Sequence, residues 1–344
     1  MQTQKKPLLI VHIGMGKTGS SSIQKTLAGA TEVLARQHAL YVGLNFERST
    51  YLKYSWQKAQ GWPELFEKED TKFHTELKDV LLYTLKEAKD NNISTLIWSN
   101  ESLFSANQKV IPVLLELQKS ENIDITIISY VRRHDSWAQS AYVQWGIKHK
   151  TYRGELKPFR EWINKGRLNY SASTNAWAEN FIDFQLINFD KAGNIVKALF
   201  DAAGLDYSHI HERRDNESPN ITALTLWAMF NDLSHEPVLP HALEGLLKRS
   251  GVLDKSPRSL DIKDLLPNQQ DLEHVRKISK DDRDNINQIL KKCGQPSIEV
   301  DNSKPKNSHI DHWQIHSALL MMIVDLNKQV NVLKRQIKNL NSSN

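Results

Sequence analysis

Short apolar runs bounded by polar or turn residues recur along the first 190 residues of the chain. Four stand out, at 8–14 (LLIVHIG), 94–100 (STLIWSN), 124–131 (DITIISYV) and 184–190 (FQLINFD), and ALYVGLN at 39–45 is a further candidate. These runs are rich in β-branched residues and lack alternation with polar residues. That pattern is typical of strands buried on both faces.

Helical patterns lie between these apolar runs and cover residues 20–37, 75–91 and 110–122. Strands that alternate with helices form a mostly parallel sheet with helices on both faces, so we expect an α/β fold of three layers. Ligands of such sheets bind beyond the carboxyl ends of the strands. The polar motifs described below fall at those ends.

Residues 191 to about 300 continue as helical patterns separated by loops, at 192–204, 222–233 and 281–294. A stretch rich in Asn, Ser, Lys and Pro follows. We therefore place a linker at 301–311, between a domain of residues 1–300 and a C-terminal helix at 312–344.

The C-terminal helix carries an apolar heptad pattern with spacings that alternate between four and three. Its members are Leu319, Ile323, Leu326, Val330, Leu333, Ile337 and Leu340. The β-branched residues fall at the a positions and the leucines at d, which favours a parallel two-stranded coiled coil. We therefore expect a homodimer through residues 319–340. The alternative is a single amphipathic helix that packs on its own domain.

Composition narrows the class of protein without naming a ligand. Among 344 residues, 45 Lys and Arg face 40 Asp and Glu, a net charge of +5 that favours anionic ligands but does not argue for nucleic acid. The single cysteine, Cys293, excludes an internal disulfide framework and is typical of a reducing compartment. No run approaches about 18 uninterrupted apolar residues, so we expect no membrane span. The first apolar run leads into glycines without a cleavage site, so we expect a cytoplasmic protein.

The stretch GMGKTGSSSIQ, residues 14–24, joins the first apolar run to the first helical pattern. Where a strand turns into a helix, successive backbone N–H groups face one concavity and the helix N-terminus adds partial positive charge, which together bind anions. The loop order differs from the GxxxxGK[ST] pattern of nucleotide hydrolases, because Lys17 precedes the small-residue cluster. The alternative is a glycine-rich turn with incidental serines. The glycines at 14, 16 and 19 let the backbone approach an anion closely. Lys17 supplies a positive charge, and Thr18, Ser20 and Ser21 supply hydroxyl donors.

This loop resembles the 5′-phosphosulfate loop of the sulfotransferases, which carries Lys-x-Gly-[Ser/Thr]-[Ser/Thr] after the first strand. These enzymes use 3′-phosphoadenosine-5′-phosphosulfate (PAPS) as the sulfuryl donor. HIGMGKTGSSSIQ, residues 12–24, is particularly similar to bacterial and carbohydrate sulfotransferases, in which a HIG-x-x-KTGTT-x-x-Q pattern recurs. The resemblance implies a P-loop-like fold, PAPS as co-substrate and no metal. It also implies that the donor is bound by Gly16, Lys17, Thr18, Gly19, Ser20 and Ser21.

A second motif follows the third of the four runs. In sulfotransferases an arginine at the end of a later strand and a serine eight residues further on bind the ribose 3′-phosphate. Arg132 and Ser140 have that spacing in ISYVRRHDSWAQSAYVQW. A guanidinium and a hydroxyl suit a phosphate monoester dianion. The alternative is that the arginine pair caps the sheet edge or pairs with Asp135; Arg133 is the neighbour that we expect nearer to solvent.

The chemistry needs stabilisation of the leaving group and a general base. By the resemblance, Lys17 stabilises the leaving phosphate oxygen, because positioning and electrostatics dominate such transfers. Glu101, in LIWSNESLF, leaves its strand near the expected cleft and is our candidate base for the acceptor hydroxyl. Alternatively, Glu101 caps a helix or pairs with a basic residue. His12 is interpreted as a core histidine that orients the loop, and His134 and His149 are weaker base candidates.

Two further observations concern the donor. The strands that end in WSNE and YVRR lack the aspartate that Mg²⁺-dependent nucleotide enzymes place there, which fits a metal-free sulfotransferase and counts against a kinase. RRDNESPN, residues 213–220, resembles a loop before a late helix in the same bacterial families. Arg213, Arg214, Asn216 and Ser218 are therefore expected to close over donor or acceptor. Capping of the following helix explains Ser218 and Asn220 equally well.

The acceptor is expected from the resemblance to be a hydroxyl of a carbohydrate or glycolipid. Basic stretches at 147–157 and 164–167 either attract an acidic glycan or form a solvated face. Two rival functions stay open: a kinase-like phosphotransferase, and a scaffold that binds a nucleotide without turnover and acts through its coiled coil. Six tryptophans fall near the expected cleft, where aromatic faces suit sugar rings, although most tryptophans are core: Trp56, Trp62, Trp137, Trp145, Trp162 and Trp177.

Overall fold

A computed structural model of the chain describes residues 6–58, 61–213, 221–232, 234–238 and 262–300, with scattered positions between 312 and 337. The chain divides into two compact units. The first comprises Met1–Ser140, Asn164–Asn216 and Glu273–Asp301, and the second comprises Ala141–Ile163, Glu217–Leu272 and Asn302–Asn344.

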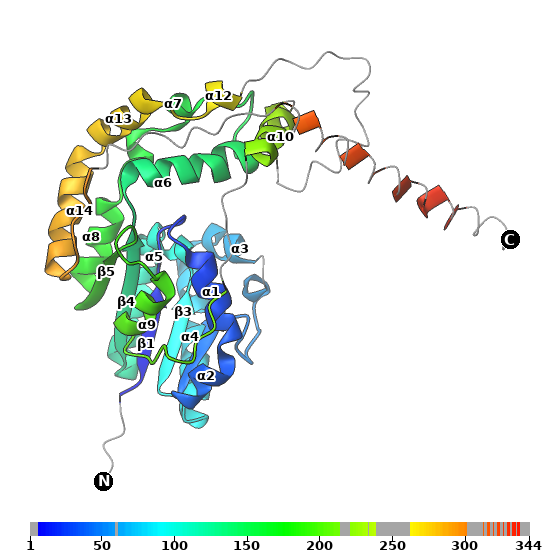
Figure 1. The fold of residues 1–344 in the computed structure, drawn as a ribbon. Coiled ribbons are helices and arrows are strands. Elements are labelled where there is room, and N and C mark those ends of the chain that lie inside the picture. Colours follow the sequence, from blue (N-terminus) through cyan, green and yellow to red (C-terminus); the bar gives the residue numbers. More distant parts are fainter. Residues whose placement is uncertain are drawn as a thin grey trace, which may run out of the picture. The chain divides into compact units, whose positions relative to one another are not determined.

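The first unit contains a sheet of five parallel strands in the order β2-β3-β1-β4-β5 (Figure 1). The predicted α/β architecture is confirmed, and the five apolar runs each form one strand. Their side chains are buried on both faces of the sheet, as the absence of polar alternation predicted. The strands are β1 (Leu8–His12), β2 (Ala39–Gly43), β3 (Thr95–Ser99), β4 (Asp124–Val131) and β5 (Asp183–Asn188).

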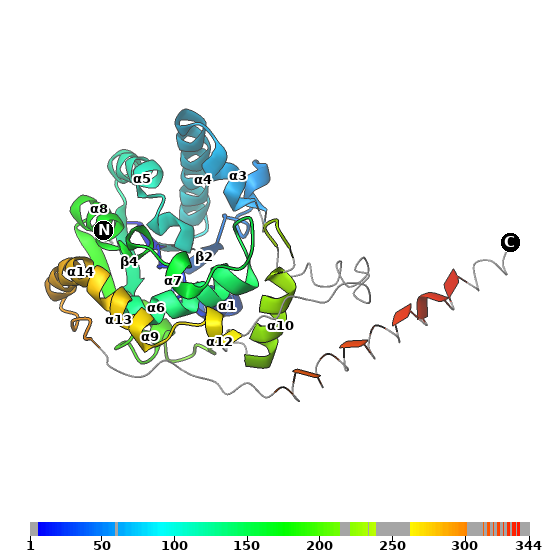
Figure 2. The same cartoon turned by 90° about the horizontal axis from the view of Figure 1, so that it is seen from above.

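Helices cover both faces of this sheet (Figure 2). One layer packs an apolar core of Ile10, Ile128, Tyr130 and Ile187 beneath α1 (Ser20–Gly29), α2 (Thr31–Arg36) and α9 (Ile195–Ala202). The opposite layer consists of α4 (Asp70–Asp90), α5 (Asn107–Glu121), α8 (Ser171–Asn180) and α14 (Lys280–Lys292). The shorter elements of this unit are η1 (Ser55–Gln57), α3 (Trp62–Glu67), η2 (Glu101–Phe104) and η4 (Lys165–Leu168), and α6 (His134–Ala141) begins in it.

The helical pattern at 20–37 forms two helices rather than the single helix that it suggested. The backbone N–H of Ala30 ends α1 by donating to the Leu27 carbonyl, and α2 begins at Thr31. Gly29 weakens the helix at this point, because glycine loses more backbone entropy than other residues.

The strand order creates a topological switch point between the carboxyl ends of β1 and β4, and the region between the loops that follow these two strands is here called the crevice. The chain leaves β1 through α1 toward β2 on one side, whereas it leaves β4 toward β5 on the other side. The loops that follow these adjacent strands therefore diverge, and such a switch point is where ligands of open parallel sheets bind. Both predicted phosphate-binding motifs begin at this point.

In its described parts the second unit consists of helices joined by irregular segments, with one antiparallel bridge between Lys150 and Val238. Tyr142 packs edge-on against Phe159 and Trp162, and the buried Lys150 ammonium donates to the Asn231 and Ser234 carbonyls. No helix in the described part of the chain is both long and apolar enough to span a bilayer. The elements are η3 (Tyr142–Lys148, a π-helical segment), α7 (Phe159–Trp162), α10 (Ile221–Asp232) and α12 (Ile262–Leu265), and α13 (Gln269–Ile278) runs from this unit into the first.

The predicted linker at 301–311 lies outside the described residues. The described positions between 312 and 337 are helical. Five members of the heptad pattern are more than one-third exposed: Leu319, Ile323, Val330, Leu333 and Ile337.

Candidate functional site

The loop between β1 and α1 adopts a backbone that depends on its glycines. Gly14, Lys17 and Gly19 all have positive φ angles, of 25°, 70° and 84°. A Cβ atom on Gly19 would collide with Cδ1 of Ile195 at the start of α9. The loop is therefore pressed against the β5–α9 connection, and only glycine fits at its last position.

Two buried polar atoms beneath this loop have no hydrogen-bond partner among the described residues: Nε2 of His12 and Oγ of Ser20. Both line the position that a Cβ on Gly14 would fill, at 2.9 and 2.6 Å respectively. The other ring nitrogen of His12 is 2.7 Å from Oγ of Ser99, and burial lowers the pKa of His12 to about 3. His12 is thus a neutral core histidine, as expected, but only one of its two ring nitrogens has a hydrogen-bond partner among the described residues. Unpartnered buried polar groups in a native protein call for a ligand or water.

The first turn of α1 has no side-chain cap from its N-cap residue. That residue is Gly19, so it offers no side-chain acceptor to the backbone N–H groups of the turn. Ser21 is half-buried at this turn. Thr18 differs from the prediction, because its side chain is fully buried and its hydroxyl donates to the Met15 carbonyl. Thr18 therefore closes the loop on itself and does not offer its hydroxyl to a ligand.

Arg132 lies where the two motifs meet. Its Nη1 donates to the carbonyl of Lys17 at 3.3 Å, its guanidinium lies 5.1 Å from the centre of the Phe189 ring, and Nε is 3.9 Å from the Asp190 carboxylate. Nε has no hydrogen-bond partner in the part of the chain that is described. Burial lowers the pKa of Arg132, and Asp190 only partly opposes this effect. A half-buried guanidinium with so little compensation favours a bound anion.

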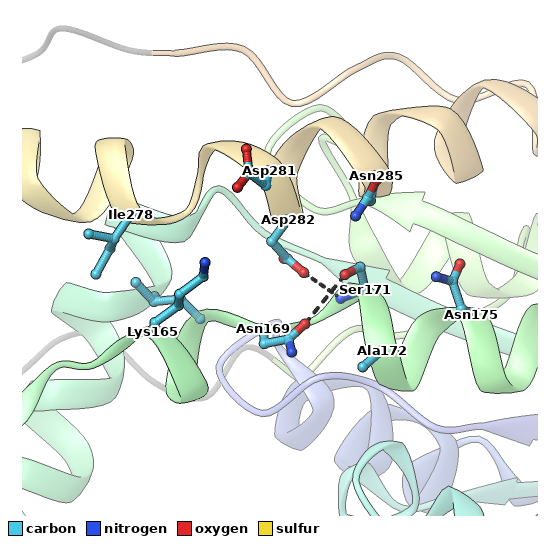
Figure 3. A pocket seen from close by; sticks show the side chains of 10 residues that line it. Lys165, Asn169, Ser171, Ala172, Asn175, Ile278, Asp281, Asp282 and Asn285 are labelled. Atoms are coloured by element: carbon cyan, nitrogen blue, oxygen red, sulfur yellow. Dashed lines mark hydrogen bonds between the residues drawn. The ribbon is translucent and has the colours of Figure 1, made fainter.

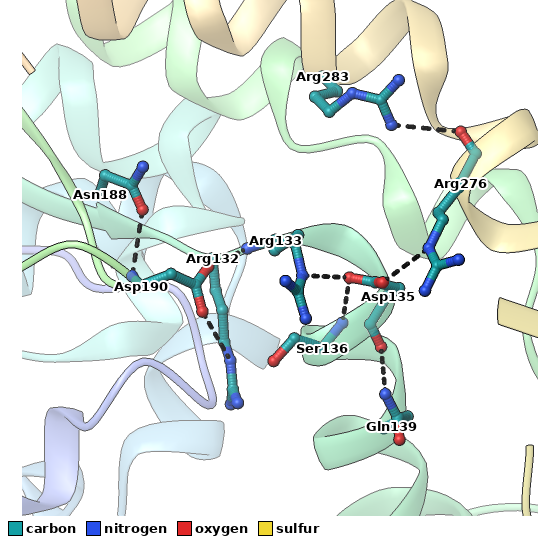
Figure 4. Close-up of polar contacts among 9 residues, drawn as sticks. All are labelled: Arg132, Arg133, Asp135, Ser136, Gln139, Asn188, Asp190, Arg276 and Arg283. Atoms are coloured by element: carbon teal, nitrogen blue, oxygen red, sulfur yellow. Dashed lines mark hydrogen bonds and ion pairs between the residues drawn. The ribbon is translucent and has the colours of Figure 1, made fainter. Parts of the chain in front are cut away.

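The predicted alternative, an arginine paired with Asp135, applies to Arg133 instead (Figure 4). Nε of Arg133 is 2.7 Å from the buried Asp135 carboxylate, which Arg276 of α13 also contacts at 3.0 Å. Arg133 is therefore tied into a structural ion pair, whereas Arg132 extends from the end of β4 toward Asp190.

The first turns of α6 contact the loop between β1 and α1. Nε1 of Trp137 donates to the Gly16 carbonyl at 2.8 Å. Ser140 is half-buried and follows Trp137 by three residues on the same helix, so it shares the face that meets the loop. Arg132, which precedes α6, and Trp137, within it, both contact the loop, and Ser140 follows Trp137 by about one turn of the helix.

Glu101 begins η2 directly after β3. Asn100 caps this turn, because its side chain accepts from the Ser102 N–H at 2.9 Å and donates to the Leu44 carbonyl at 3.0 Å. The Glu101 carboxylate, half-buried, accepts one hydrogen bond, from Nε2 of Gln24 at 2.8 Å. Among the described residues no cation pairs with it. The capping and ion-pair alternatives for Glu101 therefore find no support, and the contact with Gln24, the last residue of the loop motif, is one that the sequence did not predict.

The structure does not bring Arg213 to the loop. Its backbone N–H donates to the Thr26 hydroxyl, and its guanidinium lies against Gly29, at the C-terminal end of α1. Gly29 lies nine residues, about 13 Å of helix, from Ser20 at the start of α1. Residues 214–220, with the other candidates of that motif, lie outside the described part.

A cavity of about 300 Å³ lies elsewhere in the first unit, between α8 and α14 (Figure 3). The Asp282 carboxylate at its wall is fully engaged, with Nε2 of His134 at 2.7 Å and the backbone N–H groups of Tyr170 and Ser171 at 3.1 and 2.8 Å. His134 stacks on Tyr170, which removes it from the candidate bases. The cavity is lined by Lys165, Leu168, Asn169, Ser171, Ala172, Asn175, Ile278, Asp281, Asp282 and Asn285.

Most of the tryptophans considered as a sugar platform are core residues. Trp56, Trp137, Trp162 and Trp177 are buried, and Trp145 is half-buried. Aromatic residues at these positions therefore support packing. Within the described residues, no group of three or more His, Cys, Asp and Glu side chains is arranged to hold a metal ion.

Comparison with family models and with curated proteins finds no relative of this chain: no family model matches it, and no curated protein matches it.

Proposed function

We propose that this protein is a PAPS-dependent sulfotransferase that transfers a sulfuryl group to a hydroxyl of a carbohydrate or glycolipid. The observation that carries the proposal is the hydrogen bond between the Arg132 guanidinium and the Lys17 carbonyl. It joins two motifs that are 115 residues apart in the sequence, and each suits one phosphate of the same nucleotide.

The residues fit a donor with charge at both ends. The first turn of α1, with Gly16, Lys17, Gly19, Ser20 and Ser21, is suited to the 5′-phosphosulfate. Arg132 and Ser140 are suited to the 3′-phosphate. Nε of Arg132 and the hydroxyl of Ser20 have no hydrogen-bond partner among the described residues, and a bound anion would supply one.

The proposed reaction is an in-line displacement at sulfur. The acceptor oxygen forms a bond to sulfur while the bond from sulfur to the 5′-phosphate oxygen breaks, and the acceptor proton passes to the Glu101 carboxylate. Lys17 stabilises the negative charge that develops on the leaving phosphate. Glu101 suits the role of base because its hydrogen-bond partner is a neutral amide, so no cation competes with the acceptor proton.

The experiment is a thermal-shift comparison of 3′,5′-ADP, the desulfonated product, with ATP and Mg²⁺, followed by transfer of labelled sulfate from PAPS to a panel of glycans and glycolipids. We expect stabilisation by 3′,5′-ADP alone and label on at least one acceptor. Equal stabilisation by both nucleotides contradicts the proposal and favours the kinase-like rival. Donor binding without label transfer contradicts it in favour of the scaffold.

We further propose that residues 319–340 form a parallel coiled coil between two copies. The exposed apolar heptad positions support this, and so does the absence of like charges at the flanking g and e positions, which are Met322, Gln329, Gln336 and Asn327, Lys334, Asn341. Sedimentation equilibrium should give twice the chain mass of 39.6 kDa. Val330→Asp at an a position should yield monomers, whereas Val332→Asp, outside the seam, should leave the dimer; a monomeric wild type contradicts the proposal.

A further inference from the structure

The side chain of Gln24 connects the two halves of the crevice. It lies in the second turn of α1, and its Nε2 donates to Oε2 of Glu101 at 2.8 Å and to the Ser99 carbonyl at 3.4 Å. Ser99 in turn contacts His12 beneath the phosphate-binding loop. The helix that begins at the donor loop thus also holds the carboxylate assigned to the acceptor.

The backbone that carries Glu101 is fixed independently of Gln24. The Asn100 N–H donates to the His12 carbonyl at 3.0 Å, and the Asn100 side chain caps η2. The turn is therefore held by Asn100, and the remaining freedom lies in the Glu101 side chain, whose three torsions Gln24 restricts. The Gln24 contact is not needed to form the turn.

The direction of the hydrogen bond leaves the carboxylate ready to accept a proton. One oxygen, Oε2, is occupied by the amide, while Oε1 accepts no hydrogen bond from the described residues. We infer that Gln24 is a positioning residue that orients Oε1 of Glu101 toward the acceptor hydroxyl, so that one helix aligns both the donor loop and the base. This inference rests on the proposed function and names a residue that the sulfotransferase motifs give no role.

A purely structural role for Gln24 makes a different prediction. In that case the amide only ties α1 to β3 through the Ser99 carbonyl, and its loss lowers stability without depending on Glu101. The two roles are separated by a double-mutant cycle, because residues that act through one another show non-additive effects.

The experiment measures kcat and KM for sulfuryl transfer in wild type, Gln24→Met, Glu101→Gln and the double variant. Methionine keeps the length of glutamine and removes the donor. We expect Gln24→Met to lower kcat by about 10- to 100-fold, the effect of losing a hydrogen bond to a charged group, with KM for PAPS unchanged. In the Glu101→Gln background the same substitution should have no further effect on kcat.

Gln185→Met is the matched control, because the Gln185 amide donates to the Ala202 carbonyl within the same unit and away from the crevice. It should leave kcat at the wild-type value in both backgrounds. Melting temperatures measured on every variant identify loss of folding, and Gln24→Ala serves as a second variant if methionine perturbs the helix.

Additive losses in kcat, or a loss confined to KM or to the melting temperature, would overturn the inference while leaving the proposed function standing. A wild-type protein that transfers no sulfate to any acceptor overturns both. The two failures are therefore distinguishable in one series of measurements.

Discussion

The crevice between β1 and β4 and the cavity between α8 and α14 are both polar, but their buried groups differ in how they are satisfied. At the cavity, Asp282 accepts hydrogen bonds from a histidine and two backbone N–H groups. At the crevice, His12, Ser20 and Arg132 each keep a buried atom without a hydrogen-bond partner in the described chain. Nδ1 of His134 and the Tyr170 hydroxyl, which lie beside Asp282, also lack such a partner, but none of the residues that line the cavity has an unsatisfied buried side-chain atom.

This difference indicates where binding energy is available. A buried polar group without a partner lowers stability by about 1–3 kcal/mol, and a ligand that satisfies it recovers that free energy. A polar group whose hydrogen bonds are already made within the protein gains no further free energy from a ligand. The crevice is therefore the stronger candidate site, although the cavity of about 300 Å³ lies between α8 and α14.

The largest effect is expected from Lys17→Ala. Loss of a charge that stabilises the leaving group should lower kcat for sulfuryl transfer by about 10²- to 10³-fold, the cost of removing one donor from an oxyanion site. Steady-state kinetics with PAPS check this. Lys72→Ala, an exposed lysine on α4, is the control and should keep the wild-type kcat. A Lys17→Ala variant with full activity would show that the lysine of this loop takes no part in the reaction.

Gly14→Ala should come next. The new Cβ meets Oγ of Ser20 and Nε2 of His12 at a positive φ, which costs about 1–3 kcal/mol and closes the place where these atoms face a ligand. Titration calorimetry should show loss of 3′,5′-ADP binding. Gly294→Ala, also at positive φ but with open space around it, should strain the backbone without changing that affinity. Unchanged binding in Gly14→Ala would place the ligand elsewhere.

Asp282→Asn tests the saturated region. Although burial acts the other way, hydrogen bonds from His134 and Ser171 hold the pKa of Asp282 below its usual range. At pH values above the pKa that Asp282 has in the unfolded chain, the charged carboxylate therefore stabilises the fold. This contribution is lost as the pH falls through the lower pKa that Asp282 has in the folded protein. Urea denaturation at pH 7 should show a loss of about 1–3 kcal/mol that shrinks below about pH 4. The affinity for 3′,5′-ADP should not change. Weaker binding of 3′,5′-ADP by the variant would show that the cavity is part of the binding site.

The smallest effect is expected from Asn285→Ala, at the exposed wall of the cavity. Surface substitutions of this kind usually change the free energy of unfolding by less than about 0.5 kcal/mol. Urea denaturation and 3′,5′-ADP titration should both match the wild type. A marked loss of donor binding would show that the cavity, and not the crevice, is the stronger candidate for the binding site.

Sequence patterns predicted the sheet well, because strand formation depends on local burial that β-branched runs report directly. The break after Gly29 was missed although the glycine was a local signal for it, whereas the position of Arg213 depends on how the chain returns to pack on α1. The site was predicted in its motifs but not in its contacts. Gln24 and Glu101 are 77 residues apart, and nothing local to either residue shows that they meet. Thr18 illustrates the converse, since its hydroxyl suited a ligand by type but closes its own loop.

The central claim, that one nucleotide is held at both ends, is tested most directly by titrating wild type and Arg132→Ala with 3′,5′-ADP and with 5′-AMP, which lacks the 3′-phosphate. We predict that Arg132→Ala weakens 3′,5′-ADP by about 10- to 100-fold and leaves 5′-AMP within about twofold, so that the two nucleotides become nearly equivalent. Arg36→Ala, an exposed arginine on α2, should change neither affinity. An equal loss for both nucleotides, or no loss for either, would contradict the assignment of Arg132 to the 3′-phosphate and with it the claim that one nucleotide bridges the two motifs.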